Sequence, residues 1–212
     1  MLLQDIPTFY INLKKREDRN KHILQELKKI NIKNFERFNA IEMTNGAIGC
    51  SLSHIKCLEM AIKRNYEYVM ICEDDVEILN PELFIKNINT FLNSSIKWDV
   101  VLIAGNNMLP YKIITDYCIQ INNCLTTTGY IVKKYYFETL LENYKEGIQK
   151  LLREPTNNNY KIDKYWLFLQ NKDNWFLIIP PTIVQREDYS DIEKKKTNFK
   201  NYMLNYNKVV KK

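Results

Sequence analysis

The stretch "YEYVMICEDDVEIL", residues 66–79, sets a short apolar run directly against three acids. The run from Val69 to Cys72 is typical of a buried strand. Glu73, Asp74 and Asp75 follow at once. Adjacent carboxylates at the end of a buried strand repel one another and lose hydration, so they need a compensating cation or water. The pattern therefore predicts a cation site at the end of a central strand.

Strand and helix patterns alternate on both sides of this stretch. Further strands are expected at 8–13, 35–43, 98–105, 124–132 and 174–185, the last of them stopped by Pro180-Pro181. Helices are expected at 16–30, 50–65, 81–93, 133–144 and 161–170. Such alternation predicts an α/β fold, with a mainly parallel, Rossmann-like sheet and helices on both faces. Ligands of such sheets bind beyond the carboxyl ends of the strands, which is where the three acids lie.

The net charge of +6 is concentrated at one end of the chain. Seven lysines and no acid fall within residues 194–212, so the rest of the chain is near neutral. We therefore expect a single domain over 1–193 followed by a basic C-terminal tail over 194–212. A near-neutral body argues against nucleic-acid binding, which requires a basic face on the folded part. The tail is interpreted either as a frayed, solvated extension or as a weak contact with an anionic membrane surface.

The cysteines and the N-terminus indicate a cytoplasmic protein, at most peripheral to a membrane. Five cysteines form no CxxC pair, so we expect reduced thiols. The first residues, "MLLQDIPTFYINL", lack the basic start and apolar stretch of a signal peptide. No apolar run approaches the roughly 20 residues that a membrane-spanning helix needs.

The residue types favour an oxygen-bound ion at the three acids. Carboxylate oxygens suit Mn²⁺ or Mg²⁺, whereas His22 and His54 are the only histidines and no Cys/His spacing resembles a zinc site. The alternative is a solvated turn that forms a salt bridge to Lys or Arg. Because none of the five glycines lies in a phosphate-binding loop motif, a nucleotide diphosphate would have to be held by metal and basic side chains. Basic residues of this kind follow the first strand in "NLKKREDR".

Taken in order, several blocks resemble glycosyltransferase family 25 over about residues 8–192. They are "FYINLKKREDR", "GAIGCSLSHIKCLEMAI", "YVMICEDDVEI", "TTTGYIVKKYYFETLL", "IDKYWLF" and "PPTIVQREDYSDI". The family includes lipooligosaccharide galactosyltransferases and the galactosyltransferase domains of collagen-modifying enzymes. The resemblance implies the GT-A nucleotide-sugar transferase fold, a DxD-type metal motif, a UDP-sugar donor, commonly UDP-galactose, and inversion at the anomeric carbon.

The resemblance also implies roles for individual residues. Asp75, with Glu73, is expected to bind the metal. Donor-binding residues are expected at Asn12, Arg16, Arg19, Gly49, His54, Glu73 and Asp74. Asp163 is the first candidate for the catalytic base, with Asp188 and Asp191 as alternatives. Without the resemblance, Asp163 is equally an acid at a helix start, and His54 a buried structural histidine.

The function predicted from the sequence is a metal-dependent inverting transferase. It would move a hexose, galactose by family default, from a UDP-sugar to an acceptor hydroxyl. The acceptor would be a glycan, a lipooligosaccharide or hydroxylysine on a collagen-like polypeptide. The competing hypothesis is a catalytically silent family member that acts as a binding or assembly module.

Overall fold

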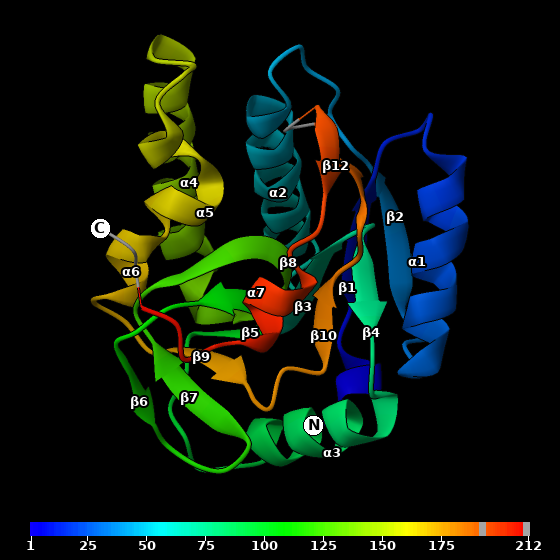
Figure 1. The fold of residues 1–212 in the computed structure, drawn as a ribbon, viewed down its shortest axis with the longest axis vertical. Helices are drawn as coiled ribbons and strands as arrows, with labels where there is room; N and C mark the ends of the chain where they lie inside the picture. Colours follow the sequence, from blue (N-terminus) through cyan, green and yellow to red (C-terminus); the bar gives the residue numbers. More distant parts are fainter. Residues whose placement is uncertain (191–193, 210–212) are drawn as a thin grey trace.

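The computed structural model describes residues 1–190 and 194–209 and centres on one eight-stranded sheet (Figure 1). The strand order is β2-β1-β3-β8-β5-β9-β7-β6. The strands are β1 (Thr8–Asn12), β2 (Phe35–Asn39), β3 (Tyr68–Glu73), β5 (Val100–Asn107), β6 (Tyr111–Ile113), β7 (Cys118–Ile121), β8 (Cys124–Lys133) and β9 (Trp175–Ile178). Short strands β4 (Val76–Ile78) and β10 (Ile183–Gln185) form a separate antiparallel pair.

Six of the eight strands run in the same direction, which confirms the mainly parallel sheet. β1 is parallel to β2 and β3, and β5 is parallel to β9. β8 is antiparallel to both of its neighbours, β3 and β5, and β7 is antiparallel to β6 and β9. Because β8 is reversed, its first residues lie at the same edge as the last residues of β3. This places Thr127 next to the three acids.

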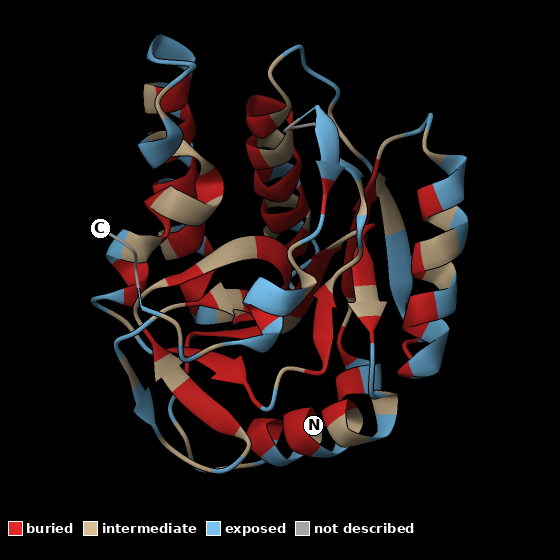
Figure 2. Ribbon diagram, in the orientation of Figure 1, coloured by how far each residue is buried: buried red, intermediate tan, exposed pale blue. Residues whose placement is uncertain are grey.

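Helices cover both faces of the sheet, as expected. They are α1 (Glu17–Lys29), α2 (Gly46–Lys63), α3 (Pro81–Leu92), α4 (Phe137–Arg153), α5 (Ile162–Tyr165), α6 (Leu167–Gln170) and α7 (Lys200–Leu204). Val69 and Ile71 of β3 pack with α2 and α4, whereas Met70 and Cys72 pack with α1 and α3. Both faces of β3 are therefore buried, as Figure 2 shows for the central strands. This double burial explains the unbroken apolar run before Glu73.

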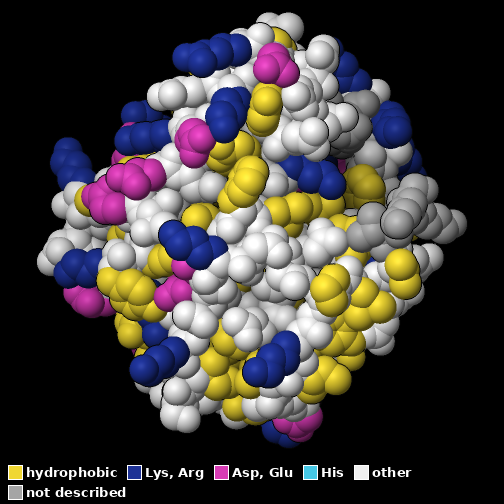
Figure 3. Space-filling model, turned by 90° about the vertical axis from the view of Figure 1, so that its left-hand side faces the viewer, with side chains coloured by type: hydrophobic (Ala, Val, Ile, Leu, Met, Phe, Trp, Pro, Cys, Tyr) yellow, Lys and Arg dark blue, Asp and Glu magenta, His cyan; other side chains and the backbone are white. Residues whose placement is uncertain are grey.

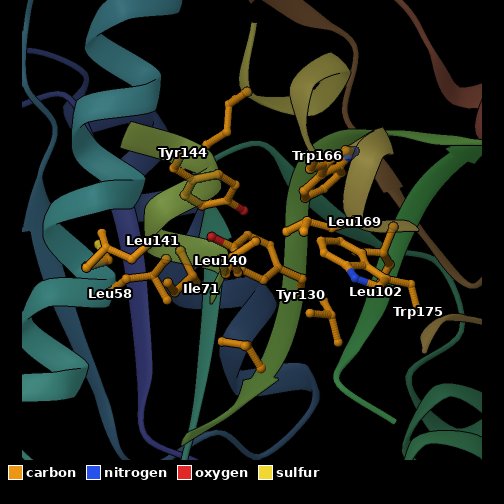
Figure 4. Packing of buried hydrophobic residues seen from close by; sticks show 14 of the residues in the cluster. Leu58, Ile71, Leu102, Tyr130, Leu140, Leu141, Tyr144, Trp166, Leu169 and Trp175 are labelled. Carbon is orange, nitrogen blue, oxygen red and sulfur yellow. The ribbon is translucent and has the colours of Figure 1, made fainter. Parts of the chain in front are cut away.

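Trp166 and Trp175 lie inside this core. Both indoles are fully buried, and their rings contact each other edge to face at 5.2 Å between centroids. Figure 4 shows them with Tyr130 and Leu102. Their role is packing.

Several element boundaries differ from the sequence expectation. α2 begins at Gly46 rather than at residue 50, because the Asn45 side chain accepts a hydrogen bond from the Ala47 amide and caps the helix. The helix expected over 161–170 is divided into α5 and α6. The strand expected over 174–185 stops before Pro180-Pro181, as predicted, but the residues after the prolines form a second strand, β10, which pairs with β4. These changes move β10 next to the acidic turn.

The described part of the tail, residues 194–209, packs against the domain. β12 (Lys195–Thr197) pairs with β11 (Asp188–Ser190), and Met203 of α7 is fully buried. Farther on, Asn107 Nδ2 donates a hydrogen bond to the Tyr206 carbonyl at 3.0 Å. The interpretation of these residues as a frayed, solvated extension is therefore wrong. Residues 210–212 lie outside the described part.

The surface agrees with the near-neutral body. On the face shown in Figure 3, Lys and Arg side chains are scattered, with Asp and Glu among them. Among the described residues, none of the helices is both long and apolar enough to cross a membrane.

Candidate active site

The acids lie at the carboxyl ends of β1 and β3, which are neighbouring parallel strands. The register pairs Ile11 with Glu73, so Asn12 and Asp74 follow side by side. Successive residues at a strand end point to opposite faces. Glu73 accordingly contacts His54 of α2, whereas Asp74 contacts α1 on the other face.

Arg19 of α1 is the cation that compensates Asp74. Its Nη1 donates to Asp74 Oδ1 at 2.9 Å and lies 3.9 Å from Asp75 Oδ2. Asn12 Nδ2 donates to the other Asp74 oxygen at 2.6 Å. Burial raises the pKa of Asp74, while the Arg19 charge and the Asn12 hydrogen bond act in the opposite direction. The salt bridge to an arginine, left open by the sequence, is therefore present for this acid.

Asp75 lies in the turn after β3, which ends at Glu73. Its Oδ2 accepts a hydrogen bond from Gln185 Nε2 of β10 at 2.6 Å. Its Oδ1 is buried and has no hydrogen-bond partner among the described residues. Burial, with the charges of Glu73 and Asp74, raises the pKa of Asp75 to about 8. A buried carboxylate oxygen without a donor suits a hard divalent cation, so the residues present fit the implied metal.

Asp188 is held by arginines. Its Oδ2 lies 3.2 Å from Arg16 Nη2 and from Arg19 Nε, and 3.8 Å from Arg186 Nε. Burial raises the pKa of Asp188, but the Tyr189 amide and the three guanidinium charges outweigh it, so the pKa lies below its usual value. Asp188 thus anchors Arg16 and Arg19. Asp191, the other alternative base, lies outside the described residues.

Glu73 is the acceptor at the centre of a polar cluster between α2 and β8. Its Oε1 lies 2.5 Å from Thr127 Oγ1, 3.3 Å from His54 Nε2 and 3.7 Å from Cys50 Sγ. The other ring nitrogen of His54, Nδ1, is 2.9 Å from the Tyr130 hydroxyl. Burial raises the pKa of Glu73, but the His54 and Thr127 hydrogen bonds outweigh it, and the net pKa is lowered. His54 is both fully buried and in contact with a site carboxylate.

Gly49 and Ser53 explain the spacing of "GAIGCSLSH". A Cβ at Gly49 would lie 2.4 Å from the Ile41 carbonyl oxygen, so only glycine lets α2 approach this segment. Ser53 Oγ accepts a hydrogen bond from the Ile41 amide at 2.9 Å and donates to the Gly49 carbonyl. The motif thus fixes the segment before α2, which lines the site.

Asp163 lies across the site from the acids, at the start of α5. Its Oδ2 accepts a hydrogen bond from the Thr126 amide at 3.2 Å. Thr126 has a φ of 73°, which is rare for a β-branched residue and typical of backbone held by its surroundings at a functional site. Burial raises the pKa of Asp163, with the Thr126 hydrogen bond opposing it.

Two pockets meet at Glu73 and Cys50. The first, of about 170 Å³, is lined by the end of β1, the segment before α2 and the start of α2, with Leu13, Lys15, Arg19, Ile41, Met43 and His54 among its residues. The second, of about 340 Å³, is lined by Thr126–Thr128, α5 and the C-terminal segment, with Asn106, Asp163, Gln185 and Phe199 among its residues. The arrangement provides one cavity with apolar walls and both basic and acidic groups, and one with hydroxyl groups and the half-buried carboxyl of Asp163.

The structure unites most of the residues singled out from the sequence and adds others. Asn12, Arg16, Arg19, Asp74 and Asp188 form one connected network, while His54 and Glu73 belong to the cluster of Cys50 and Thr127. Residues not singled out by sequence reasoning are Gln185, Arg186, Phe199 and Tyr130. For Arg186, the only indication in the sequence was its position in the block "QREDYSDI".

Comparison with known proteins agrees with this site. The family model described as glycosyltransferase family 25 (LPS biosynthesis protein) matches residues 41–166, more than half of the chain. The chain belongs to glycosyltransferase family 25. The match includes Gly49, His54, the three acids and Asp163. This membership agrees with the resemblance found in the sequence pattern.

Two relatives of this family-25 chain extend the comparison. A Haemophilus influenzae protein named "Putative glycosyltransferase" is 30% identical, over 36% of this chain and 40% of its own. Human procollagen galactosyltransferase 2 is 23% identical, over 77% of this chain and 30% of its own. The chain thus spans well under half the length of either relative.

A solved structure supports the GT-A fold. The crystal structure of a glycosyltransferase involved in glycosylation of the major capsid of PBCV-1 superposes with a TM-score of 0.54. The two chains are 15% identical, and the match covers 89% of this chain and 96% of the other. The family-25 chain therefore has the mixed α/β architecture of the GT-A nucleotide-sugar transferases.

Proposed function

We propose that this chain is a divalent-metal-dependent, inverting transferase that moves a hexose, galactose by preference, from a UDP-sugar to an acceptor hydroxyl. The observation that supports it most is the pair of pockets meeting at Glu73 and Cys50. A transferase needs two adjoining compartments, one for the nucleotide and one for the acceptor, with the reacting carbon at their junction.

The first pocket is suited to the nucleotide. Leu13, Ile41 and Met43 give apolar surface for a base and ribose. Lys15 and Arg19 bring positive charge to the same pocket, where a diphosphate would be bound without a glycine-rich loop. Asp188 keeps the Arg19 side chain in place through the Nε contact at 3.2 Å. The donor would therefore lie along the carboxyl ends of β1 and β3.

Asp75 is the acid proposed to hold Mn²⁺ or Mg²⁺, whereas Glu73, expected beside it from the sequence, is engaged by His54 and Thr127. When bound, the ion would supply Lewis-acid stabilisation of negative charge on the leaving diphosphate. The free Asp75 Oδ1 supports this assignment.

The second pocket is suited to the acceptor, and Asp163 is the proposed base. Asp163 lines this pocket, whereas Asp188 is held between three guanidinium groups. A raised pKa makes a carboxylate a stronger proton acceptor than an ordinary one. The threonines of β8 offer hydroxyl partners for the groups of a sugar.

The reaction then has a direct form. The acceptor oxygen attacks the anomeric carbon from the face opposite the phosphate, and the new carbon–oxygen bond forms as the bond to UDP breaks. UDP leaves with the electron pair, and the acceptor proton passes to Asp163. General-base assistance of this kind contributes typically 10²–10⁴-fold to the rate.

We also propose the class of acceptor, on the basis of the family description and of one relative's name. A glycan or lipooligosaccharide hydroxyl is supported by the family's description, and hydroxylysine of a collagen-like chain by the name of the human relative. We also propose a cytoplasmic location, supported by five cysteines that are all unpaired in the structure.

A hydrolysis assay across UDP-sugars with Mn²⁺ tests the proposal, because it identifies the donor without the acceptor. We expect UDP release from UDP-galactose, and a loss of at least about 100-fold in Asp163→Asn, with unchanged UDP binding. Asp116→Asn is the matched control, because Asp116 is an exposed residue in the loop after β6. UDP binding without turnover on any sugar would favour the silent binding module. Equal activity of Asp163→Asn and the control would exclude Asp163 as the base.

A further inference from the structure

Cys50, His54 and Glu73 bring three different ligand types to one point. Their Sγ, ring nitrogen and carboxylate oxygen lie within 4.8 Å of one another, the only such group of three among the described residues. Cys50 and His54 are one helical turn apart on α2, so both face β3. Glu73 closes the triangle from the end of that strand. The acids Asp74 and Asp75 do not take part, since they turn to Arg19 and Gln185.

From this cluster we infer a site for a thiophilic divalent ion, Zn²⁺ or Co²⁺, held by Cys50 Sγ, His54 Nε2 and Glu73 Oε1. This site is distinct from the oxygen-bound metal proposed at Asp75. It also departs from the sequence expectation, which found no zinc-type spacing, because a Cys-x₃-His pair completed by a distant Glu matches no familiar pattern.

The spacing of the ligand atoms fits a tetrahedral ion. For usual zinc bond lengths, a tetrahedral site separates nitrogen and oxygen ligands by roughly 3.4 Å, and sulfur and oxygen ligands by roughly 3.6 Å. The structure has 3.3 Å between His54 Nε2 and Glu73 Oε1, and 3.7 Å between Cys50 Sγ and Glu73 Oε1. Both separations are close to those of ligands that share an ion, and the nitrogen–oxygen distance is at the long end for a hydrogen bond.

The surroundings hold the ligands in place. The Tyr130 hydroxyl lies 2.9 Å from His54 Nδ1, so the Nε2 atom is directed at the cluster. A second hydrogen bond on the far nitrogen is what metal-binding histidines almost always have. Thr127 Oγ1 similarly holds the Glu73 carboxylate. The rings of His54 and Tyr130 are stacked with centroids 5.7 Å apart, which further limits rotation.

The position of this metal site places its open coordination position at the junction of the two pockets. Three protein ligands leave the fourth position of a tetrahedral ion open, as in catalytic zinc sites. Cys50 and Glu73 line both pockets, so this open position faces their junction. On binding, the thiol proton of Cys50 passes to solvent, and the ion's two charges are balanced by the thiolate and the carboxylate.

Titration of the whole chain with Co²⁺, with no nucleotide present, tests the site. We expect one ion per chain, with the visible bands of tetrahedral Co²⁺ and a thiolate-to-metal charge-transfer band in the near ultraviolet. Cys50→Ser should abolish the charge-transfer band and weaken binding at least about tenfold, because a hydroxyl is a poor ligand for this ion. Cys57→Ala is the matched control, since Cys57 is a buried thiol of the same helix outside the cluster.

Each outcome decides the question. Absence of tetrahedral bands in the unmodified chain, or a charge-transfer band that survives in Cys50→Ser, would overturn the site. His54→Gln gives a second reading if Cys50→Ser misfolds, and there the tetrahedral visible bands should be lost. Since the titration uses neither donor nor acceptor, it is independent of the proposed transferase activity. Zn²⁺ should displace Co²⁺ in the same titration, whereas Mn²⁺ should not.

Discussion

Asp75 and Asp188 show how two acids of one site acquire opposite properties. Both lie near Arg19, but Asp75 is buried beside other carboxylates, while Asp188 lies among three guanidinium groups. Desolvation and like charge favour the neutral form of Asp75, and the positive charges favour the ionised form of Asp188. Because both residues are aspartates, their surroundings account for the opposite shifts in their pKa values.

The raised pKa of Asp75 predicts a pH-dependent stability. With a folded-state pKa of about 8 against an ordinary value of 3.8, the folded protein binds this proton more tightly than the unfolded chain. The contribution of Asp75 to the unfolding free energy is therefore fully present below about pH 4 and is lost as the pH rises to about 8. Asp75→Asn should reduce this slope and raise stability at pH 8 by about 1–2 kcal/mol.

Urea denaturation of both proteins between pH 5 and pH 9, without divalent ions, checks this prediction. An unchanged slope in Asp75→Asn would contradict it. Addition of Mn²⁺ at pH 8 should stabilise the unmodified chain more than the variant, because the ion replaces the proton.

Gly49 predicts a defect confined to the nucleotide pocket. In Gly49→Ala the new Cβ would meet the Ile41 carbonyl oxygen at 2.4 Å, and backbone has to move. We expect a loss of about 1–3 kcal/mol in unfolding free energy and about tenfold weaker UDP binding, roughly 1.4 kcal/mol. Denaturation and calorimetric titration with UDP measure the two effects.

Gly147→Ala is the control for this change. Its Cβ would meet the Tyr165 ring at 2.9 Å, away from the first pocket, so stability should fall without a change in UDP affinity. Equal UDP affinities in the two variants would contradict the role given to Gly49.

At the scale of elements, the C-terminal segment is a wall of the acceptor pocket. β11, β12 and α7 return along the sheet edge and bring Phe199 to the second pocket. Lys208 Nζ donates to the carbonyls of Asn107, Tyr202 and Asn205, which fastens the segment to β5. Lys208 of the basic tail thus holds the C-terminal segment against the domain through hydrogen bonds.

Phe199→Ala should therefore weaken use of the acceptor and leave donor hydrolysis unchanged. Loss of an apolar contact in a substrate pocket typically costs 10–200-fold in specificity, so we expect an increase of about tenfold in acceptor KM. Tyr202→Ala, at a 60% exposed position three residues later, is the matched control. A parallel loss of donor hydrolysis in Phe199→Ala would contradict a role limited to the acceptor.

Elements with clear periodicity were predictable, and short paired strands were not. β1, β3 and α3 follow from apolar runs and from Asn80-Pro81 at a helix start, where the Asn80 side chain caps α3. β4 and β10 have three residues each, too few to show a period, and they pair across more than a hundred positions. Their pairing brings Gln185 of β10 within hydrogen-bond distance of Asp75.

The candidate site was partly accessible from the sequence. The resemblance to family 25 indicated His54, Glu73 and Asp163, because it ties distant motifs together. The pairing of Asp74 with Arg19 was not predictable, since several basic residues follow β1 and only the orientation of α1 selects one. Gln185 and Arg186 are brought to the acids by a backbone hydrogen bond, which the Arg186 amide donates to the Asp75 carbonyl. A contact between residues so far apart in the sequence leaves no local sequence pattern.

At the scale of the molecule, the two pockets predict a nucleotide footprint in the first pocket and a sugar footprint at their junction. UDP alone should protect amides near residues 13–19 and 40–50 from hydrogen exchange, because these segments line the first pocket. UDP-galactose, bound to Asp163→Asn to prevent turnover, should add protection near 126–128, where Thr127 contacts Glu73 at the junction. Mass-spectrometric hydrogen exchange measures both. Identical footprints for the two ligands would contradict the division between the pockets.

The reversed central strand β8 also bears on how the molecule acquires activity during folding. β8 pairs with β3 and β5, and its contacts with β3 join residues about sixty positions apart. Such distant pairings form slowly, because the entropy cost of closing a long loop comes before any stabilising contact has formed. Thr127 reaches Glu73 only through this pairing. A refolding chain should therefore regain helical signal before it can hold a ligand, and recovery of ligand binding should mark the last kinetic phase.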